Sequence, residues 1–367
     1  MITSSPRLAS LDQFRGYTVL AMVFVNFAGG YEHIPKMFGH HHVYCSFADT
    51  VMPGFLFCVG TAMRLTFMRR SATDGKRAAY VKAIKRNLGL IFVGCVVYHF
   101  TGGFRTWAVV GKEDLGPFLR NTIKRGPFEA LTHIGVTSLF VLPVIGRGAL
   151  VRVAYAVAAG AAHVWASRAG YYEWNLTEPV GIDGGPLGFL TWSIPLIAGT
   201  LVTDLLDSPE HPWEIYLLLV LGVGVMLSAF VASNLHLLRL CERTDVTFPF
   251  VHPEDLDFAN THKDYWTMSQ RAGSVTYTTF GAGFSFTLFA LFRLVVDGFG
   301  IRWSYLDLLG RHALVAYVAH DVIMDTVKPF VPKDALAWFV LLGFAVVMAA
   351  LTLILRYFDR NKFMVRL

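Results

Sequence analysis

Residues 40–69 have the sequence HHHVYCSFADTVMPGFLFCVGTAMRLTFMR and decide the fold, because a run of histidines leads directly into a long apolar block. The block carries an acid, Asp49, and a proline, Pro53, near its start. An ionisable group at the edge of a long apolar segment is costly to bury and is rarely placed there for packing alone. The stretch therefore predicts a membrane helix with a functional site at its mouth.

The composition of the whole chain also indicates a membrane protein. Of the 367 residues, 54% are hydrophobic and only 16% are charged, which leaves too little polar surface for a soluble protein of this length. The apolar residues fall in blocks of about 18 to 24 residues, each long enough to cross about 30 Å of hydrocarbon as a helix. The expected ten blocks are 12–31, 46–69, 86–104, 127–146, 149–168, 186–205, 213–235, 273–296, 305–325 and 335–357. We expect an all-α polytopic membrane protein with about ten transmembrane helices in one domain, residues 1–367.

Basic residues in the short connections predict the orientation of the chain in the bilayer. Seven lysines and arginines lie between Arg69 and Arg86, and four more lie in the tail after residue 355. With ten helices these groups share one side, so both termini are expected in the cytoplasm and the histidines on the extracytoplasmic side. The bacterial inner membrane is the expected location. The net charge of +6 is explained by this topology, and no basic patch with interleaved aromatic residues indicates a nucleic-acid partner.

Three interpretations compete for His40, His41 and His42. Consecutive side chains diverge, so one metal ion would need ligands from elsewhere; neither an HExxH motif nor a CxxC pair occurs, and no metal is expected. The second interpretation is an idle interfacial loop. The third is a catalytic site, because Asn26 and Asp49 lie at the outer ends of the first two blocks, at the depth of the histidines.

This third interpretation fits general-base catalysis. A neutral imidazole can take a proton from an attacking hydroxyl or amine. Asn26 could donate a hydrogen bond to a developing oxyanion, and Asp49 could either hold the histidine tautomer or cap the second helix. The sequence has no GxSxG motif and no P-loop, so it offers a base without a protein nucleophile. The pattern favours transfer between two bound substrates, or a histidine that is itself transiently acylated.

Several segments carry a family resemblance. They are RLASLDQFRG at 7–16, MVFVNFAGG at 22–30, ADTVMPGFLFCVG at 48–60 and, more weakly, residues 128–140 and RHALVAYVAH at 311–320. Together they resemble the heparan-alpha-glucosaminide N-acetyltransferase family. The resemblance implies a transmembrane acyltransferase that takes acetyl from cytoplasmic acetyl-CoA and delivers it to a saccharide acceptor, an amino sugar or a sugar hydroxyl, on the other side of the membrane. It is also compatible with a homodimer.

The resemblance suggests roles for individual residues. The catalytic histidine of the family maps to His40 or His41, and the different loop length leaves both open; its asparagine maps to Asn26 and its aspartate to Asp49. At His312 the family more often has asparagine, which leaves the role of this histidine open. The candidates on the acceptor side are Glu129, His133, His312 and His320. The candidates for the phosphates of acetyl-CoA, which require cations, are Arg15, Arg64, Arg70, Arg86 and Arg293.

A multi-pass transporter of a small polar solute is the alternative function. Buried Asp, His and Arg in a ten-helix bundle are also typical of transporters. That class predicts paired, interrupted helices in a repeated arrangement, and the sequence shows no internal repeat. Binding of acetyl-CoA to the purified protein separates the two classes.

Overall fold

The structure is a computed structural model that describes residues 9–99, 124, 128–206, 213–239, 246–261 and 263–363. Within these ranges the regular structure is helical and no strand occurs. The predicted all-α class is thereby confirmed. The last residues of the predicted block 86–104 lie outside the described ranges.

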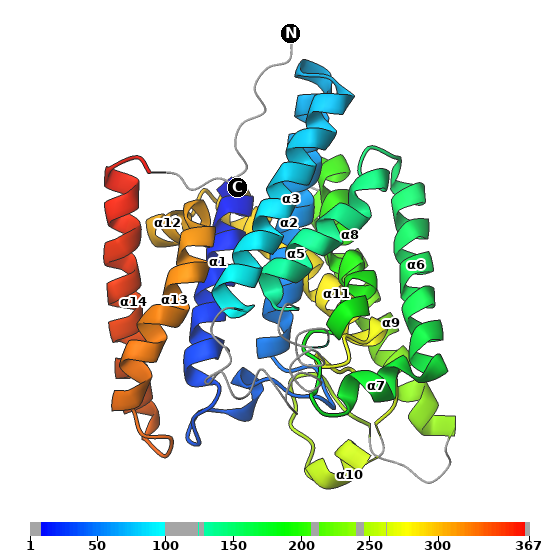
Figure 1. The fold of residues 1–367 in the computed structure, drawn as a ribbon, viewed down its shortest axis with the longest axis vertical. Helices are drawn as coiled ribbons and strands as arrows, with labels where there is room; N and C mark the ends of the chain where they lie inside the picture. The colour runs from blue at the N-terminus through cyan, green and yellow to red at the C-terminus, as the bar shows by residue number, and fades with distance from the viewer. Residues whose placement is uncertain are drawn as a thin grey trace, which may run out of the picture.

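Long helices pack side by side in one bundle, with α14 along one side and α6 along the other (Figure 1). Helix α1 begins and α14 ends at the same end of the bundle, the upper end in Figure 1, whereas the connection between α1 and α2 lies at the lower end. The long helices are α1 (Ala9–Ala28), α2 (Val51–Thr73), α3 (Lys76–His99), α5 (Ala130–Val141), α6 (Ala149–Ala166), α8 (Gly188–Leu206), α9 (Trp213–Arg239), α11 (Val275–Phe292), α13 (Ala313–Val327) and α14 (Ala337–Arg360). Shorter helices are α7 (Tyr172–Leu176), α10 (Leu256–Thr261) and α12 (Ser304–Arg311).

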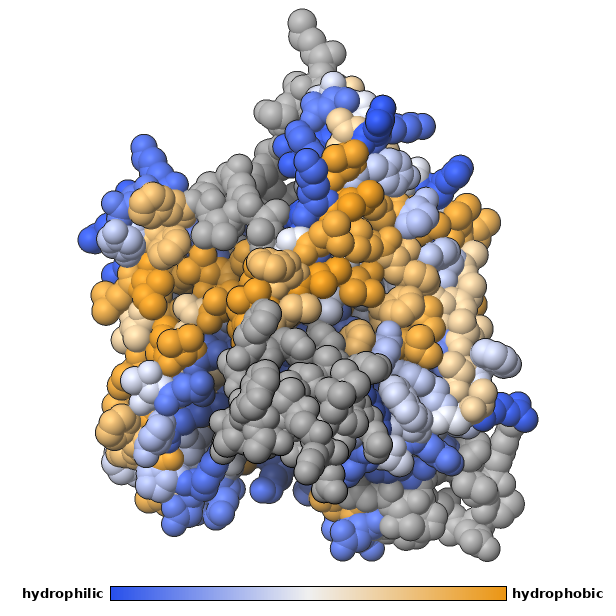
Figure 2. Space-filling model, in the orientation of Figure 1, coloured by the Kyte–Doolittle hydropathy of each residue, from blue (hydrophilic) through white to orange (hydrophobic). Residues whose placement is uncertain are grey.

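Part of the predicted membrane topology is supported by the helices themselves. Among the described residues, six candidate spans are long and apolar enough to cross a bilayer: Ala48–Thr73, Ala149–Leu176, Gly185–Leu205, Trp213–Asn234, Val275–Gly298 and Ala337–Arg360. A band of apolar residues crosses the middle of the molecule between hydrophilic ends (Figure 2). The other four predicted blocks also form helices, at α1, α3, α5 and α12–α13. Ten membrane crossings and the cytoplasmic location of both termini stay predictions.

The block expected as one helix at 305–325 is divided at His312. The backbone of this residue has φ −112° and ψ 28°, so that α12 ends before it and α13 begins after it. Its imidazole Nε2 lies 3.2 Å from a carboxylate oxygen of Asp359, near the end of α14. The single-helix prediction is wrong here because this polar contact accompanies a break that the apolar pattern does not reveal.

Two glycines set the crossing of α2 and α8, on which the positions of two functional loops depend. A Cβ atom at Gly60 would lie 1.9 Å from the carbonyl oxygen of Leu196, and a Cβ atom at Gly199 would lie 2.0 Å from that of Phe57. The two backbones are therefore in direct contact, as small residues allow between membrane helices. The crossing fixes the start of α2 relative to the loop that precedes α8.

We expect Gly60→Ala to destabilise the protein by about 3 kcal/mol, because the added methyl group must displace the backbone of α8. The matched control is Gly224→Ala in α9, where an added Cβ would meet no atom within 4 Å. Thermal denaturation in detergent measures both variants. A Gly60→Ala protein that melts with the wild type would contradict the direct contact of the two backbones.

Candidate functional site

The connection between α1 and α2, residues 29–50, doubles back onto the end of α1; we call it the histidine loop. A Cβ atom at Gly29 would lie 2.4 Å from the carbonyl oxygen of Phe38, and one at Gly39 would lie 2.8 Å from that of Gly29. This close backbone approach requires glycine at both positions. It brings His40, the next residue, to the end of α1, where Asn26 lies one turn before Gly29.

Asp49 is the most constrained polar residue of the histidine loop, with only 1% of its surface exposed. One of its carboxylate oxygens accepts hydrogen bonds from the backbone N–H and the hydroxyl group of Ser46, at 2.9 and 2.8 Å. Its carbonyl oxygen accepts a hydrogen bond from the hydroxyl group of Tyr277, on α11, at 2.8 Å. The carboxylate does not cap α2, whose N-cap residue is Thr50 and has no side-chain cap.

The second carboxylate oxygen of Asp49 lies 2.8 Å from Nδ1 of His40. The hydrogen-bond geometry requires Nδ1–H as the donor, which leaves Nε2 as a proton acceptor. Among the described residues Nε2 has no hydrogen-bond partner, and the His40 side chain is 45% exposed. The arrangement is an imidazole held in one tautomer by a buried carboxylate, with Nε2 open to a proton donor.

Electrostatics favour the protonated form of His40. Surrounding protein atoms lower the pKa of its imidazole, but the hydrogen bond and charge of Asp49, together with the charge of Asp183, outweigh this effect and raise the pKa above its ordinary value. For Asp183, burial has the larger effect. It raises the pKa of the carboxyl group to about 6, although the hydrogen bond of Gln270 and the charge of His40 act to lower it. The charge of each residue therefore affects the pKa of the other.

The other two histidines of the run have different environments. The Nε2–H group of His41 donates to the carbonyl oxygen of Lys36 at 2.8 Å, and its ring stacks on Tyr44 with the centroids 4.6 Å apart. Burial and then the charge of Arg271 lower the pKa of His42 to about 4. Of the three imidazoles, His40 is the one paired with Asp49.

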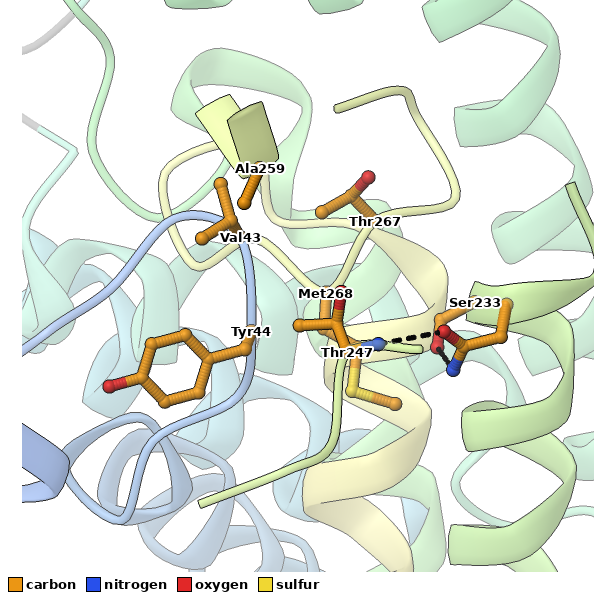
Figure 3. A pocket seen from close by; sticks show the side chains of 8 residues that line it. Val43, Tyr44, Ser233, Thr247, Ala259, Thr267 and Met268 are labelled. Carbon is orange, nitrogen blue, oxygen red and sulfur yellow. Dashed lines mark hydrogen bonds between the residues drawn. The ribbon is translucent and has the colours of Figure 1, made fainter. Parts of the chain in front are cut away.

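A small recess lies beside the histidine loop (Figure 3). Its lining residues are Val43, Tyr44, Ser233, Asn234, Thr247, Ala259, Thr267 and Met268. The amide of Asn234, at the end of α9, accepts a hydrogen bond from the N–H of Thr247 at 3.2 Å and donates one to Ser233 at 3.1 Å. The phenol ring of Tyr44 points away from the other labelled side chains, and Val43, Tyr44 and Ala259 form a buried cluster. This packing anchors the loop after the histidines.

The structure brings Asn26 to His320 instead of placing it in contact with the His40–Asp49 pair. The Asn26 side chain is exposed, and its amide nitrogen lies 3.2 Å from Nε2 of His320, which is 1% exposed. The same Nε2 lies 3.2 Å from a carboxylate oxygen of Asp321, and Nδ1 is bonded to the carbonyl oxygen of Tyr317. His320, predicted on the acceptor side, is thus a buried partner of Asn26.

The remaining acceptor-side candidates lie in different places. His133, on α5, is 1% exposed, and both ring nitrogens lack a hydrogen-bond partner, although the ring lies against the backbone at Ile182. Glu129 is the N-cap residue of α5 and accepts the backbone N–H of His133 through its carbonyl oxygen. His312 lies at the upper end of the bundle with Asp359, opposite the histidine loop.

Two of the five predicted phosphate-binding arginines contact carboxylates of other helices. Arg64 bonds to Asp204 at 2.9 Å, and the same aspartate contacts the fully buried Arg152. Arg293 bonds to Asp297 at 2.9 Å and lies 3.9 Å from Glu214. These arginines hold helices together.

Of the other three candidates, Arg86 on α3 lies within electrostatic range of Arg15 on α1 and of Arg70 on α2. Arg15 also contacts Asp12 at 3.4 Å. Arg15 lies in the second turn of α1, which begins at the end of the bundle opposite the histidine loop (Figure 1), and Arg70 lies in the last turn of α2. Such a group can bind phosphate.

Sequence reasoning missed Ser46, Tyr277, Asp183 and Gln270. The first two act on Asp49 and have no motif of their own. Asp183 did carry a signal, because it is a single acid placed between apolar and glycine residues just before a long apolar block, as Asp49 is. Gln270 becomes visible only in the fold, where its amide donates to Asp183 at 2.5 Å.

The fold and the site define a membrane protein with an apolar helical bundle and, at one end, a buried carboxylate paired with an imidazole. The chain belongs to the family described as heparan-alpha-glucosaminide N-acetyltransferase, catalytic, which matches residues 7–192, just over half of its length. The match includes Asn26, the histidine loop and Asp183 and confirms the family predicted from the sequence. No curated protein matches the chain. Family membership supports a transmembrane acetyltransferase.

We expect Asp49→Asn to lower the pKa of His40 by about one unit or more, because an imidazolium loses its directly bonded anion. Diethyl pyrocarbonate modifies neutral imidazole, so the pH midpoint of His40 carbethoxylation, followed by mass spectrometry, reports this pKa without any assay of activity. A midpoint that is the same in Asp49→Asn and wild type would contradict the pairing.

Proposed function

We propose that the protein transfers acetyl from cytoplasmic acetyl-CoA to an extracytoplasmic saccharide, an amino sugar or a sugar hydroxyl. The observation that carries the proposal is the His40–Asp49 pair, in a chain of this acetyltransferase family. The loop that holds the pair folds back to Gly29, one turn after Asn26 on α1. The working unit is residues 1–367 in the bacterial inner membrane, with both termini cytoplasmic. A homodimer fits the resemblance and is not needed for the chemistry.

In the proposed step, Nε2 of His40 takes the proton from the acceptor amine or hydroxyl as its nitrogen or oxygen attacks the thioester carbonyl. The new bond to the acyl carbon forms, the carbon–sulfur bond breaks, and the imidazolium returns the proton to the departing thiolate. Asp49 stabilises the imidazolium through Nδ1–H. The Asn26 amide donates to the oxygen that gains negative charge. No protein nucleophile is required.

The two ends of α1 suit the two ends of acetyl-CoA. Arg15 lies near the start of α1 and Asn26 near its end, eleven residues apart. At 1.5 Å per residue this is about 17 Å, comparable to an extended pantetheine arm. Phosphates at the arginine group would therefore leave the thioester near the histidine loop. We propose that Arg15, Arg70 and Arg86 bind the phosphates.

We expect His40→Ala to reduce acetyl transfer by 100-fold or more, since a positioned general base contributes about 10²–10⁴. His41→Ala, one residue away, should retain most activity because its ring bonds to a backbone carbonyl and packs on Tyr44. Transfer from radiolabelled acetyl-CoA to glucosamine in proteoliposomes measures both. Full activity in the two single variants and the double variant would overturn the proposal.

We expect Arg86→Gln to weaken acetyl-CoA binding roughly tenfold, because a charge-assisted hydrogen bond contributes about 1.5–3 kcal/mol. The matched control is Lys85→Gln, which removes an exposed charge of the same sign from the adjacent position of α3. Isothermal titration with acetyl-CoA in detergent compares the variants. Equal affinities would remove Arg86 from the phosphate site.

A further inference from the structure

The loop before α8 carries a buried carboxyl group that the proposed mechanism does not use. Asp183 is 7% exposed and has φ 51°, the left-handed region that residues other than glycine rarely adopt. Gly184 and Gly185, which follow it, also have positive φ angles. A strained residue of this kind persists only where its surroundings hold it, and such residues cluster at functional sites.

The surroundings of Asp183 hold both its backbone and its side chain. The indole N–H of Trp192, one turn into α8, donates to the carbonyl oxygen of Asp183 at 2.7 Å. The amide of Gln270 donates to one carboxylate oxygen at 2.5 Å. Asn175 steadies the same turn, since its amide donates to the carbonyl oxygen of Arg271, which also accepts the N–H of Gly184. The side chain is thus fixed in direction and its second oxygen is left out of these bonds.

Two aromatic residues tie Asp183 to Asp49. Trp192 bonds to the backbone of Asp183, and Tyr277 bonds to the backbone of Asp49. The two rings are fully buried and meet edge to face, with centroids 5.6 Å apart and planes at 84°. Since the rings are in contact and each bonds to one aspartate, the loops before α2 and α8 are joined into one rigid unit.

The charges around this unit act on His40. Of the charged groups in the described ranges, the carboxylates of Asp49 and Asp183 are those that bear on its imidazole. The hydroxyl group of Tyr277 is buried and donates a hydrogen bond to the backbone of Asp49, and burial raises the pKa of the Cys45 thiol. The positive charges nearby, those of Arg271 and Lys263, act on His42 instead.

We propose that Asp183 is a positioning residue of the His40 site: its carboxylate, held by Gln270 and Trp192, supplies a second negative charge that stabilises the imidazolium formed when His40 takes a proton. The inference rests on the proposed function, in which His40 is the base. Asp49 stabilises the cation by direct hydrogen bonding, and Asp183 stabilises it through space. No further bond is made or broken in this step.

The test uses Asp183→Asn, which keeps an acceptor for Gln270 and removes the charge. Loss of one negative charge that acts on His40 should lower the pH midpoint of the acid limb of kcat/KM by about 0.5 to 1.5 units. The midpoint of His40 carbethoxylation should fall by the same amount. Glu254→Gln, which removes an exposed charge from the loop before α10, should leave both midpoints unchanged.

Gln270→Ala is the second variant, and it serves where Asp183→Asn does not fold. Loss of the Gln270 amide removes a hydrogen bond that favours the ionised form of Asp183. Both midpoints should therefore move in the same direction as in Asp183→Asn, by a smaller amount. An unchanged carbethoxylation midpoint in the folded variants would overturn the inference. A shifted carbethoxylation midpoint in a protein that transfers no acetyl group would overturn the proposed function and leave the coupling of Asp183 to His40 standing.

Discussion

The site depends on the burial of one carboxylate, that of Asp49. A buried charge is costly unless it is paired and hydrogen-bonded. Asp49 meets this condition with His40 on one oxygen and Ser46 on the other. The same bonds restrain the histidine loop, because rotation of His40 away from Asp49 would leave one oxygen of the buried carboxylate without its hydrogen-bond donor. The carboxylate thus fixes the loop as well as the imidazole tautomer.

The rest of the bundle positions this carboxylate with packing that leaves little freedom. Tyr277 holds the backbone of Asp49, and Tyr277 in turn packs on Trp192 of α8. Helix α8 packs closely against α2, because Gly60 and Gly199 bring the two backbones into contact. The hydrogen bond between His40 and Asp49 is therefore supported by packing among α2, α8 and α11. Placement on such rigid elements is what a catalytic pair requires.

The sequence predicted the fold class well and the site in part. Apolar blocks located the long helices, because membrane helices must be apolar over their full length. The apolar blocks did not reveal the break at His312, where the imidazole contacts Asp359. Asp49 and the histidine run were found from their position at the mouth of an apolar block.

The sequence does not show which histidine contacts Asp49, because this depends on how the loop folds back at Gly29 and Gly39. Tyr277 and Gln270 were missed for a related reason. Tyr277 is 228 positions from Asp49 and Gln270 is 87 positions from Asp183, so these pairs become neighbours only through helix packing. The five candidate arginines show a further limit of prediction from sequence. The sequence gives their charge, but only the fold shows that Arg64 and Arg293 are bonded to carboxylates.

The two ends of the bundle differ in charge in a way that suits a substrate with an anionic end and a neutral end. Positive charges at Arg15, Arg70 and Arg86 attract phosphates, while the carboxylates of Asp49 and Asp183 repel them. An acetyl-CoA molecule bound in reverse would place its phosphates beside two buried carboxylates. In the proposed orientation, only the uncharged thioester reaches His40, and the positive charge that develops there on proton transfer meets the two anions. The same electrostatic asymmetry would thus select the binding direction and favour the chemical step.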